Sequence, residues 1–315
     1  MPLDPILDVA ARVARALPRL RGRGALAQRL SRSPSNREGM WHIRMAKGHV
    51  LDLPRASEQT WQAAFTGRYD DEEIDLISRF IVPDGLVLDV GACFGFYAVP
   101  LGIEAQRHNA YLAAFEPVPS NFALLQRNLS ANGLTKTVVA LPIALGERVL
   151  SRRMWVEAGG AGNAVLLNDQ LERLGWEMEN LDVRVQPLDE VELPSPLAGR
   201  RCCVVKMDIE GAELEALSGG RKFFAEHRPV VLGEFNTFFL EKNRLEPNVV
   251  QIWADDNGYS CFEIRLARTS ALSDRRRIGL RPLTRYSLRG TMSLLLVPKE
   301  HPVQQDPEWA SILVS

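Results

Sequence analysis

The segment "VVKMDIEGAE" (204–213) ends an apolar run with a lysine and three acids. In a strand, alternate side chains point to opposite faces, so Lys206 and Asp208 share one face, and Asp208 and Glu210 emerge where the strand ends. A carboxylate in that position can take the proton of an acceptor hydroxyl or fix the hydroxyl in place. We therefore predict catalytic roles for Asp208 first and Glu210 second, with Lys206 as their partner, because a lysine inside an apolar strand needs a counter-charge. A purely structural pair of Lys206 and Asp208 is the alternative.

A second stretch, "LVLDVGACFGFYAV" (86–99), offers a place for a ligand. An aliphatic run stops at Asp89 and turns through Gly91 and Gly95 before a helical pattern begins. Glycine lets the backbone approach a ligand closely, and the start of a helix presents free N–H groups that suit a carboxylate or a phosphate. NAD, FAD and S-adenosylmethionine all fit such a turn.

Three details distinguish these cofactors. Dinucleotide sites have a glycine where this chain has Cys93, and Asp89 would repel a pyrophosphate but attract an ammonium group. Glu116, at the end of the next apolar run, can accept hydrogen bonds from two ribose hydroxyls. The alternatives are structural: a loop or helix-cap acid for Asp89 and a surface acid for Glu116. We predict S-adenosylmethionine as the cofactor, bound by Asp89, Gly91, Ala92, Cys93, Phe94, Gly95, Glu116 and Ala144.

The elements that must position these residues begin after residue 83. Short apolar runs alternate there with helical patterns, which predicts an α/β fold with a doubly wound, mostly parallel sheet. Ligands bind such sheets at the carboxyl ends of the strands, where the strand order reverses. A helix at 120–133 is expected to have Ser120 as its N-cap and Gly133 as its stop. The seven strand candidates are 86–90, 111–116, 137–145, 202–209, 229–235, 260–265 and 292–298.

The segment before this domain is strongly basic at its start. Seven arginines oppose two aspartates in residues 1–33, and apolar residues recur there at helical spacing. This helix either contacts an acidic surface or an anionic membrane, or packs on its own domain. A short strand or a hairpin near 40–53 and two helical pieces follow, the second capped by Asp70 or Asp71. The predicted division is 1–39, a basic helical extension and linker; 40–84, an accessory segment; 85–300, the cofactor-binding domain; and 301–315, a tail.

Composition narrows the class of protein. The chain has 315 residues and a net charge of -1, which gives no general attraction to nucleic acid or membrane. No stretch reaches the roughly 20 apolar residues of a membrane span, and the early arginines interrupt any secretory signal. The four cysteines have no metal-ligand spacing and are expected to be reduced thiols. We expect a cytoplasmic protein.

Four segments resemble, in order and spacing, the FkbM-type S-adenosylmethionine-dependent methyltransferases. They are "VLDVGACFGFYAV", "AFEPVPSNFALLQRNLSANG", "VVKMDIEGAELEALSGG" and "RPVVLGEF", and the upstream "FTGRYDDEE" resembles the segment before the family's first strand. The resemblance implies the seven-stranded class I (Rossmann-like) fold and methyl transfer, most often to an oxygen of a small molecule or glycan. The family usually has asparagine where this chain has Cys93.

Three functions are compared. A small-molecule or glycan O-methyltransferase is favoured. A nucleic-acid methyltransferase needs a polar-aromatic clamp at the end of the fourth strand, where this chain has "DIEG". The third is a non-catalytic binding module that docks through the basic amino terminus. A divalent cation held by Asp208, Glu210 and Glu234 has no support from ligand spacing, so no metal is predicted.

Overall fold

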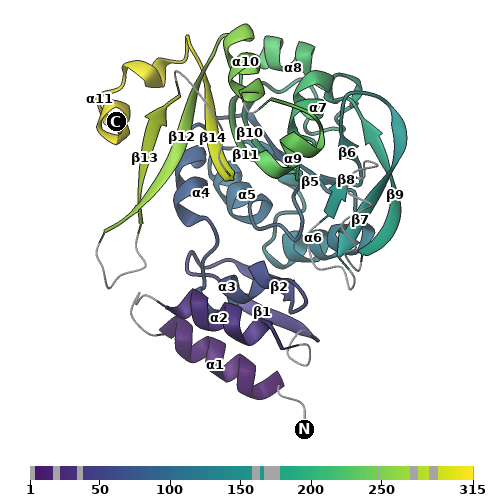
Figure 1. Ribbon diagram of the computed structural model, residues 1–315, viewed down its shortest axis with the longest axis vertical. Coiled ribbons are helices and arrows are strands. Elements are labelled where there is room, and N and C mark those ends of the chain that lie inside the picture. Colours follow the sequence, from purple (N-terminus) through teal and green to yellow (C-terminus); the bar gives the residue numbers. More distant parts are fainter. Residues whose placement is uncertain are drawn as a thin grey trace.

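The computed structural model describes residues 4–16, 22–33, 38–157, 164–166, 178–246, 248–269, 276–283 and 290–314. Its centre is an eight-stranded sheet with the order β13-β12-β14-β11-β10-β3-β4-β5 (Figure 1). The strands are β3 (Leu86–Val90), β4 (Tyr111–Phe115), β5 (Val138–Leu141), β10 (Cys202–Met207), β11 (Val230–Asn236), β12 (Tyr259–Arg268), β13 (Arg276–Pro282) and β14 (Thr291–Pro298). Each of the seven candidates supplies a strand of this sheet, and β13 is an eighth at its edge.

The strand directions confirm the predicted doubly wound fold. The strands β5, β4, β3, β10 and β11 are parallel, and β14 is antiparallel to both β11 and β12. The chain runs outward from β3 through β4 to β5 and then returns to place β10 on the other side of β3. The strand order therefore reverses between β3 and β10, which is where such sheets bind their ligands.

Helices cover both faces of the sheet and close two hydrophobic cores. The first core includes α5 (Ala98–Arg107) and α6 (Pro119–Ala131), and the second includes α7 (Glu213–Gly219), α8 (Arg221–His227), α9 (Thr237–Lys242) and α10 (Val249–Asp256). In β10, Val205 and Met207 face the second core, while Val204 faces the first. Lys206 shares the face of Val204 because side chains alternate along a strand, and this is the predicted arrangement.

Upstream, a lobe of helices and a hairpin packs against α6 (Figure 1). It comprises α1 (Asp4–Ala16), α2 (Arg23–Ser31), β1 (Met40–Arg44), β2 (Val50–Pro54) and α3 (Glu58–Thr66). The side chains of Asn128 and Asn132 on α6 each donate to and accept from the backbone of β2, at Asp52 and Val50, over 2.7–3.0 Å. These four bonds satisfy the outer edge of the hairpin, so the lobe is joined to the sheet domain by specific polar contacts.

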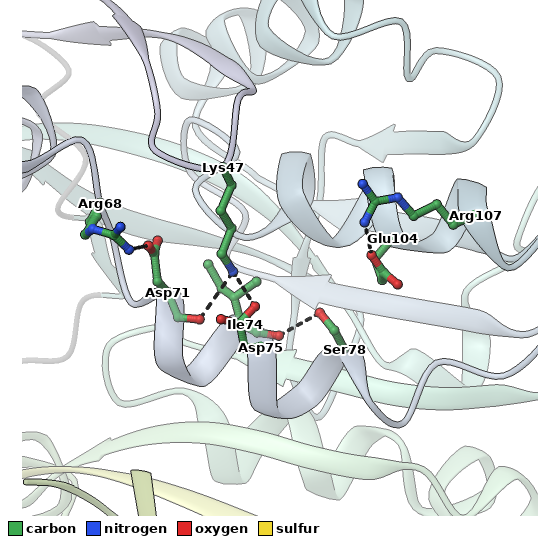
Figure 2. Close-up of polar contacts among 8 residues, drawn as sticks. All are labelled: Lys47, Arg68, Asp71, Ile74, Asp75, Ser78, Glu104 and Arg107. Carbon is green, nitrogen blue, oxygen red and sulfur yellow. Dashed lines mark hydrogen bonds and ion pairs between the residues drawn. The ribbon is translucent and has the colours of Figure 1, made fainter. Parts of the chain in front are cut away.

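A second group of contacts, drawn in Figure 2, fixes α4 (Asp71–Ser78), the helix that precedes β3. Lys47, in the hairpin turn, donates from Nζ to Asp75 Oδ1 at 2.6 Å and to the carbonyl of Asp71 at 3.3 Å. Arg68 pairs with the Asp71 carboxylate. Asp70 precedes the first residue of this helix, as predicted, but its side chain makes no capping hydrogen bond.

One further expectation, the N-cap of a helix, is corrected. The N-cap of α6 is Val118, so Ser120 lies inside the helix; Pro119 occupies the first turn, where its fixed φ favours helix initiation. In the predicted tail, Trp309 on α11 (Pro307–Ile312) is buried, with its ring 5.4 Å from that of Phe262. This part of the chain therefore packs on the sheet.

The sequence offered no prediction for a smaller sheet between β5 and β10. Its strands have the order β6-β9-β7-β8 and are β6 (Ala144–Leu145), β7 (Leu150–Glu157), β8 (Ala164–Leu166) and β9 (Met178–Gln186). In the chain, β6 follows β5 directly, and its short parallel pairing with β9 makes it part of the smaller sheet.

Candidate active site

A cavity opens at the carboxyl ends of β3, β4 and β10. Eight of the predicted site residues line it: Gly91, Ala92, Cys93, Glu116, Ala144, Lys206, Asp208 and Glu210. Three do not, namely Asp89, Phe94 and Gly95. The tertiary fold thus brings together the catalytic and cofactor candidates, which come from four separate stretches of sequence.

The two glycines of the turn have different reasons for being there. A Cβ on Gly91 would lie 2.0 Å from the carbonyl oxygen of Asp208, so glycine is what allows the ends of β3 and β10 to approach. A Cβ on Gly95 would instead meet the side chains of Leu125 and Val99 at 3.1 Å. Gly95 therefore serves the packing of helices, whereas Gly91, which lines the cavity, serves the approach of two strands.

Cys93 has a left-handed backbone, with φ of 49°. Among residues other than glycine, asparagine and aspartate adopt this conformation most readily, because their short polar side chains bond locally. The asparagine that is usual at this position in the FkbM family thus has a conformational reason. The replacement by cysteine does not alter the backbone N–H, which donates to Glu116.

Glu116, directly after β4, is held in one orientation. Its Oε2 accepts the N–H of Cys93 and its Oε1 accepts the N–H of Val118, both at 2.9 Å. Burial raises the pKa of Glu116 to about 7, against the lowering effect of these donors. The carboxylate lines the cavity beside the glycine turn, which suits the predicted contact with ribose hydroxyls.

Asp89 faces a neighbouring strand rather than the cavity. It pairs in register with Lys206, whose Nζ lies 3.8 Å from Asp89 Oδ1, and neither carboxylate oxygen accepts a hydrogen bond within ordinary distance among the described residues. Burial raises the pKa of Asp89 to about 6, while Lys206 lowers it. Asp89 is therefore paired with a residue that lines the cavity, and its contact with an ammonium group of the cofactor stays a prediction.

Lys206 connects this buried acid to the open site. Its Nζ also lies 3.5 Å from Asp208 Oδ2 and 4.7 Å from the centre of the Tyr97 ring. Burial alone would lower the pKa of Lys206, but Asp208 and Asp89 outweigh it and hold the pKa above its usual value. The lysine therefore remains an ammonium group, and it positions Asp208 at the cavity.

The loop that follows β10 is shaped by one of its own acids. The Glu213 carboxylate accepts the N–H groups of Ile209 and Gly211 at 3.0–3.1 Å. Glu210 has a left-handed φ of 51° within this loop, and burial together with Asp208 raises its pKa to about 8. Asp208 and Glu210 are consequently both held at the cavity by a loop with little freedom.

The structure adds residues that the sequence had not marked as functional. Tyr69 and Tyr97 line the cavity, and the Tyr97 hydroxyl donates to Glu73 at 3.0 Å and to Asp70 at 3.4 Å. Burial raises the pKa of Asp70 to about 7. The signal was present in "FTGRYDDEE", which resembled a family segment, but nothing local distinguishes a site tyrosine from a core one.

The opposite wall of the cavity is apolar. It is formed by Phe115, Ile143, Ala144, Leu145 and Met154, the last from the smaller sheet. An apolar wall in the same cavity as the Glu116 carboxylate fits the purine end of S-adenosylmethionine, so the residues present fit the predicted cofactor.

Glu234, at the end of β11, belongs to the acidic side of this region. Its pKa is raised to about 8 by burial and by the nearby Asp208 and Glu210. In the described part of the chain, no group of three or more histidine, cysteine or carboxylate side chains has an arrangement that could hold a metal ion. Glu234 is therefore one of several carboxyl groups that lie close to Asp208.

Comparison with known proteins decides the family. The model of the methyltransferase FkbM domain matches residues 89–261, more than half of the chain. The chain belongs to the FkbM methyltransferase family. This is the family that the four sequence motifs implied.

The relatives are distant and longer than the matched part. Methyltransferase 1 of Beauveria bassiana is 26% identical over 151 residues, which cover 43% of this chain and 58% of that protein. Methyltransferase sdnD of Sordaria araneosa is 27% identical over 156 residues, covering 42% and 59%. This FkbM chain thus spans less than two thirds of the length of these curated relatives.

Two solved structures are also similar. The FkbM methyltransferase from Methylobacillus flagellatus KT has 16% identity and a TM-score of 0.40, covering 76% of this chain and 53% of that one. TYW2 of M. jannaschii, solved in complex with AdoMet, has 14% identity and a TM-score of 0.36, with coverages of 82% and 84%. The fold of the FkbM chain is assigned from the order and directions of its own strands.

Proposed function

We propose that this protein transfers a methyl group to a hydroxyl oxygen of a small molecule or glycan. The observation that carries the proposal is Asp208, which lines the cavity, is partly exposed there, and is held by Lys206 at 3.5 Å. An alcohol is a weak nucleophile until its proton is removed, and a positioned carboxylate supplies that function.

Bound S-adenosylmethionine supplies a methyl carbon attached to a positively charged sulfur. In the proposed reaction, the backbone of the Gly91 turn and Glu116 hold the cofactor by its polar groups. Asp208 would accept the proton of the acceptor hydroxyl and so prepare the hydroxyl oxygen to take the methyl group that the cofactor would supply. Glu210 is the second candidate for the base, because a carboxyl group with a raised pKa is the stronger base once ionised.

The same arrangement disfavours a polyanionic acceptor. The acidic side of the site holds Asp70, Asp208, Glu210 and Glu234 around Lys206. Lys206 is the one cationic side chain among the described residues that line the cavity, and it is already paired with Asp89 and Asp208. Proteins that bind nucleic acid instead present lysines and arginines to the phosphates. We therefore propose a neutral or cationic acceptor and no nucleic acid.

We propose residues 85–300 as the catalytic domain, with a contribution from the accessory segment, because Gln59 and Tyr69 line the same cavity. A reducing compartment such as the cytoplasm is proposed because all four cysteines are free thiols. We also propose that the basic extension at 1–39 makes a peripheral contact with a membrane.

The test is incubation of the full chain with methyl-tritiated S-adenosylmethionine and fractionated cell extract. We expect label in a low-molecular-weight or glycan fraction, stable to mild alkali as a methyl ether is. Alkali-labile label would indicate a carboxyl acceptor, and nuclease-sensitive label would indicate nucleic acid; either result contradicts the proposal. The Asp208→Asn variant serves as the control for labelling by other enzymes.

A further inference from the structure

The amino-terminal helix α1 has two apolar faces. One face, formed by Leu7, Ala11 and Ala14, is buried in the core of the lobe. On the other side, Ile6, Val9 and Val13 are 66%, 59% and 54% exposed. Their spacing of three and four residues places them in one stripe along the helix. A helix that only packs on its own domain needs the first face and not the second.

The polar side chains of α1 leave this stripe uninterrupted. Arg15 turns inward and donates from a guanidinium nitrogen to the carbonyl of Ala64 on α3. Asp8 forms an ion pair with the buried Arg55 at 2.9 Å. The negative charge of Asp8 is thereby compensated within the lobe.

Positive charge borders the stripe. Arg12 is exposed on its flank, and the adjacent helix α2 presents Leu26, which is 50% exposed, together with the exposed Arg29 and Arg32. Over residues 1–33, seven arginines against two aspartates give a net charge of +5. Figure 1 shows α1 as the outermost element of the lobe, so its outer face meets no other element of the described chain.

We propose that α1 docks in the plane of an anionic lipid bilayer, with Ile6, Val9 and Val13 inserted at the level of the headgroups. Amphipathic helices with aliphatic residues on one face and arginines beside them bind such surfaces by burying the apolar stripe and attracting the lipid charge. In the described residues, no helix has the length and apolar character needed to cross a membrane. The proposed contact is therefore peripheral. It does not depend on the identity of the methyl acceptor.

The test is flotation of the full-length protein with vesicles of phosphatidylcholine alone and of phosphatidylcholine with phosphatidylglycerol. The wild type is expected to float with the anionic vesicles at low ionic strength and to be released by salt. The double variant Val9→Glu, Val13→Glu should bind the anionic vesicles about tenfold more weakly than the wild type, or weaker still. It loses the apolar insertion and adds charge repulsion. Arg12→Gln should lower partitioning roughly fivefold, because one arginine near an anionic membrane surface strengthens binding by about that factor.

The matched control is the double variant Val149→Glu, Ile252→Glu, which adds the same charge at positions 56% and 49% exposed elsewhere. It should float like the wild type, and melting curves establish that both doubles are folded. Failure of the folded wild type to float, or equal loss in the control, overturns the proposal. A wild-type dimer in light scattering that becomes a monomer only in the Val9, Val13 double, without vesicle binding, would assign the stripe to a contact between two copies.

Discussion

Lys206 and Asp89 lie opposite each other on the neighbouring parallel strands β10 and β3, with Nζ 3.8 Å from Oδ1. Both side chains are buried, and the same ammonium group reaches Asp208 at 3.5 Å. One lysine therefore compensates an acid behind the cavity wall and positions a second acid at the cavity. The two acids are expected to respond differently to mutation.

Lys206→Met should destabilise the protein by roughly 3–5 kcal/mol, because it leaves the Asp89 carboxylate buried without a counter-charge. The double variant Lys206→Met, Asp89→Asn should recover most of that loss, since the buried charge is then gone as well. Urea unfolding of the three proteins measures the effect. Equal stability of Lys206→Met and wild type would contradict the pairing.

Asp208→Asn should lower the turnover of methyl transfer by about 10²–10⁴-fold, the range for loss of a general base, while the dissociation constant of S-adenosylmethionine changes little. Its melting temperature should stay close to that of the wild type, because Lys206 keeps Asp89 as a partner. Single-turnover kinetics and calorimetry on the same preparation give both quantities. A larger rate loss in Glu210→Gln than in Asp208→Asn would transfer the base role to Glu210.

Glu116→Ala should weaken cofactor binding by roughly 1–3 kcal/mol, since bonds to a charged group are lost. The N–H groups of Cys93 and Val118 also lose their acceptor, so some loss of stability should accompany it. Glu116→Gln is the matched variant, because its amide oxygen can still accept one of these N–H groups. Titration calorimetry with S-adenosylhomocysteine would contradict the assignment if both variants bound like the wild type.

Stability without cofactor should fall as the pH rises from about 6.5 to 8. The pKa values of Asp70 and Glu116 are raised to about 7, and those of Glu210 and Glu234 to about 8, whereas unfolded carboxyl groups titrate near 4. The folded state binds more protons in that window, so deprotonation favours unfolding. His49, whose pKa is lowered by burial to about 4, contributes the opposite slope, and only at lower pH.

S-adenosylmethionine carries a net positive charge, so its affinity should increase over the same pH window as the carboxyl groups ionise. Urea midpoints and calorimetry at pH 6.5 and pH 8 measure the two opposite trends. A urea midpoint that rises with pH would show that these groups are ionised throughout the window.

Gly91→Ala should cost more than about 4 kcal/mol or abolish folding, because the new Cβ would overlap the carbonyl oxygen of Asp208 at 2.0 Å, and neither backbone can withdraw. Gly133→Ala is the control. It has a similar left-handed φ of 69° with nothing within 4 Å of the added atom, so only the strain of about 1–2 kcal/mol remains. Similar unfolding free energies for the two variants would exclude the close approach of β3 and β10.

Much of this protein was determined by local sequence. Near-continuous apolar runs between helical patterns specified the strands, because both faces of a parallel sheet are buried. The run from Cys202 to Asp208 placed Lys206 and Asp208 on one face without any knowledge of neighbours. The turn after Asp89 and the acid Glu116 indicated the cofactor, because the residues that follow the end of a strand are consecutive in the sequence.

Tertiary structure decided what depends on distance across the chain. Asp89 faces Lys206 because two strands more than a hundred residues apart lie in register. Tyr97 and Asp70 belong to the site because α4 is held beside α5, and Gly91 is required because of the Asp208 carbonyl. The exposed stripe on α1 became visible only when the other face was seen to be filled, because periodicity alone cannot tell which of two apolar faces a fold buries.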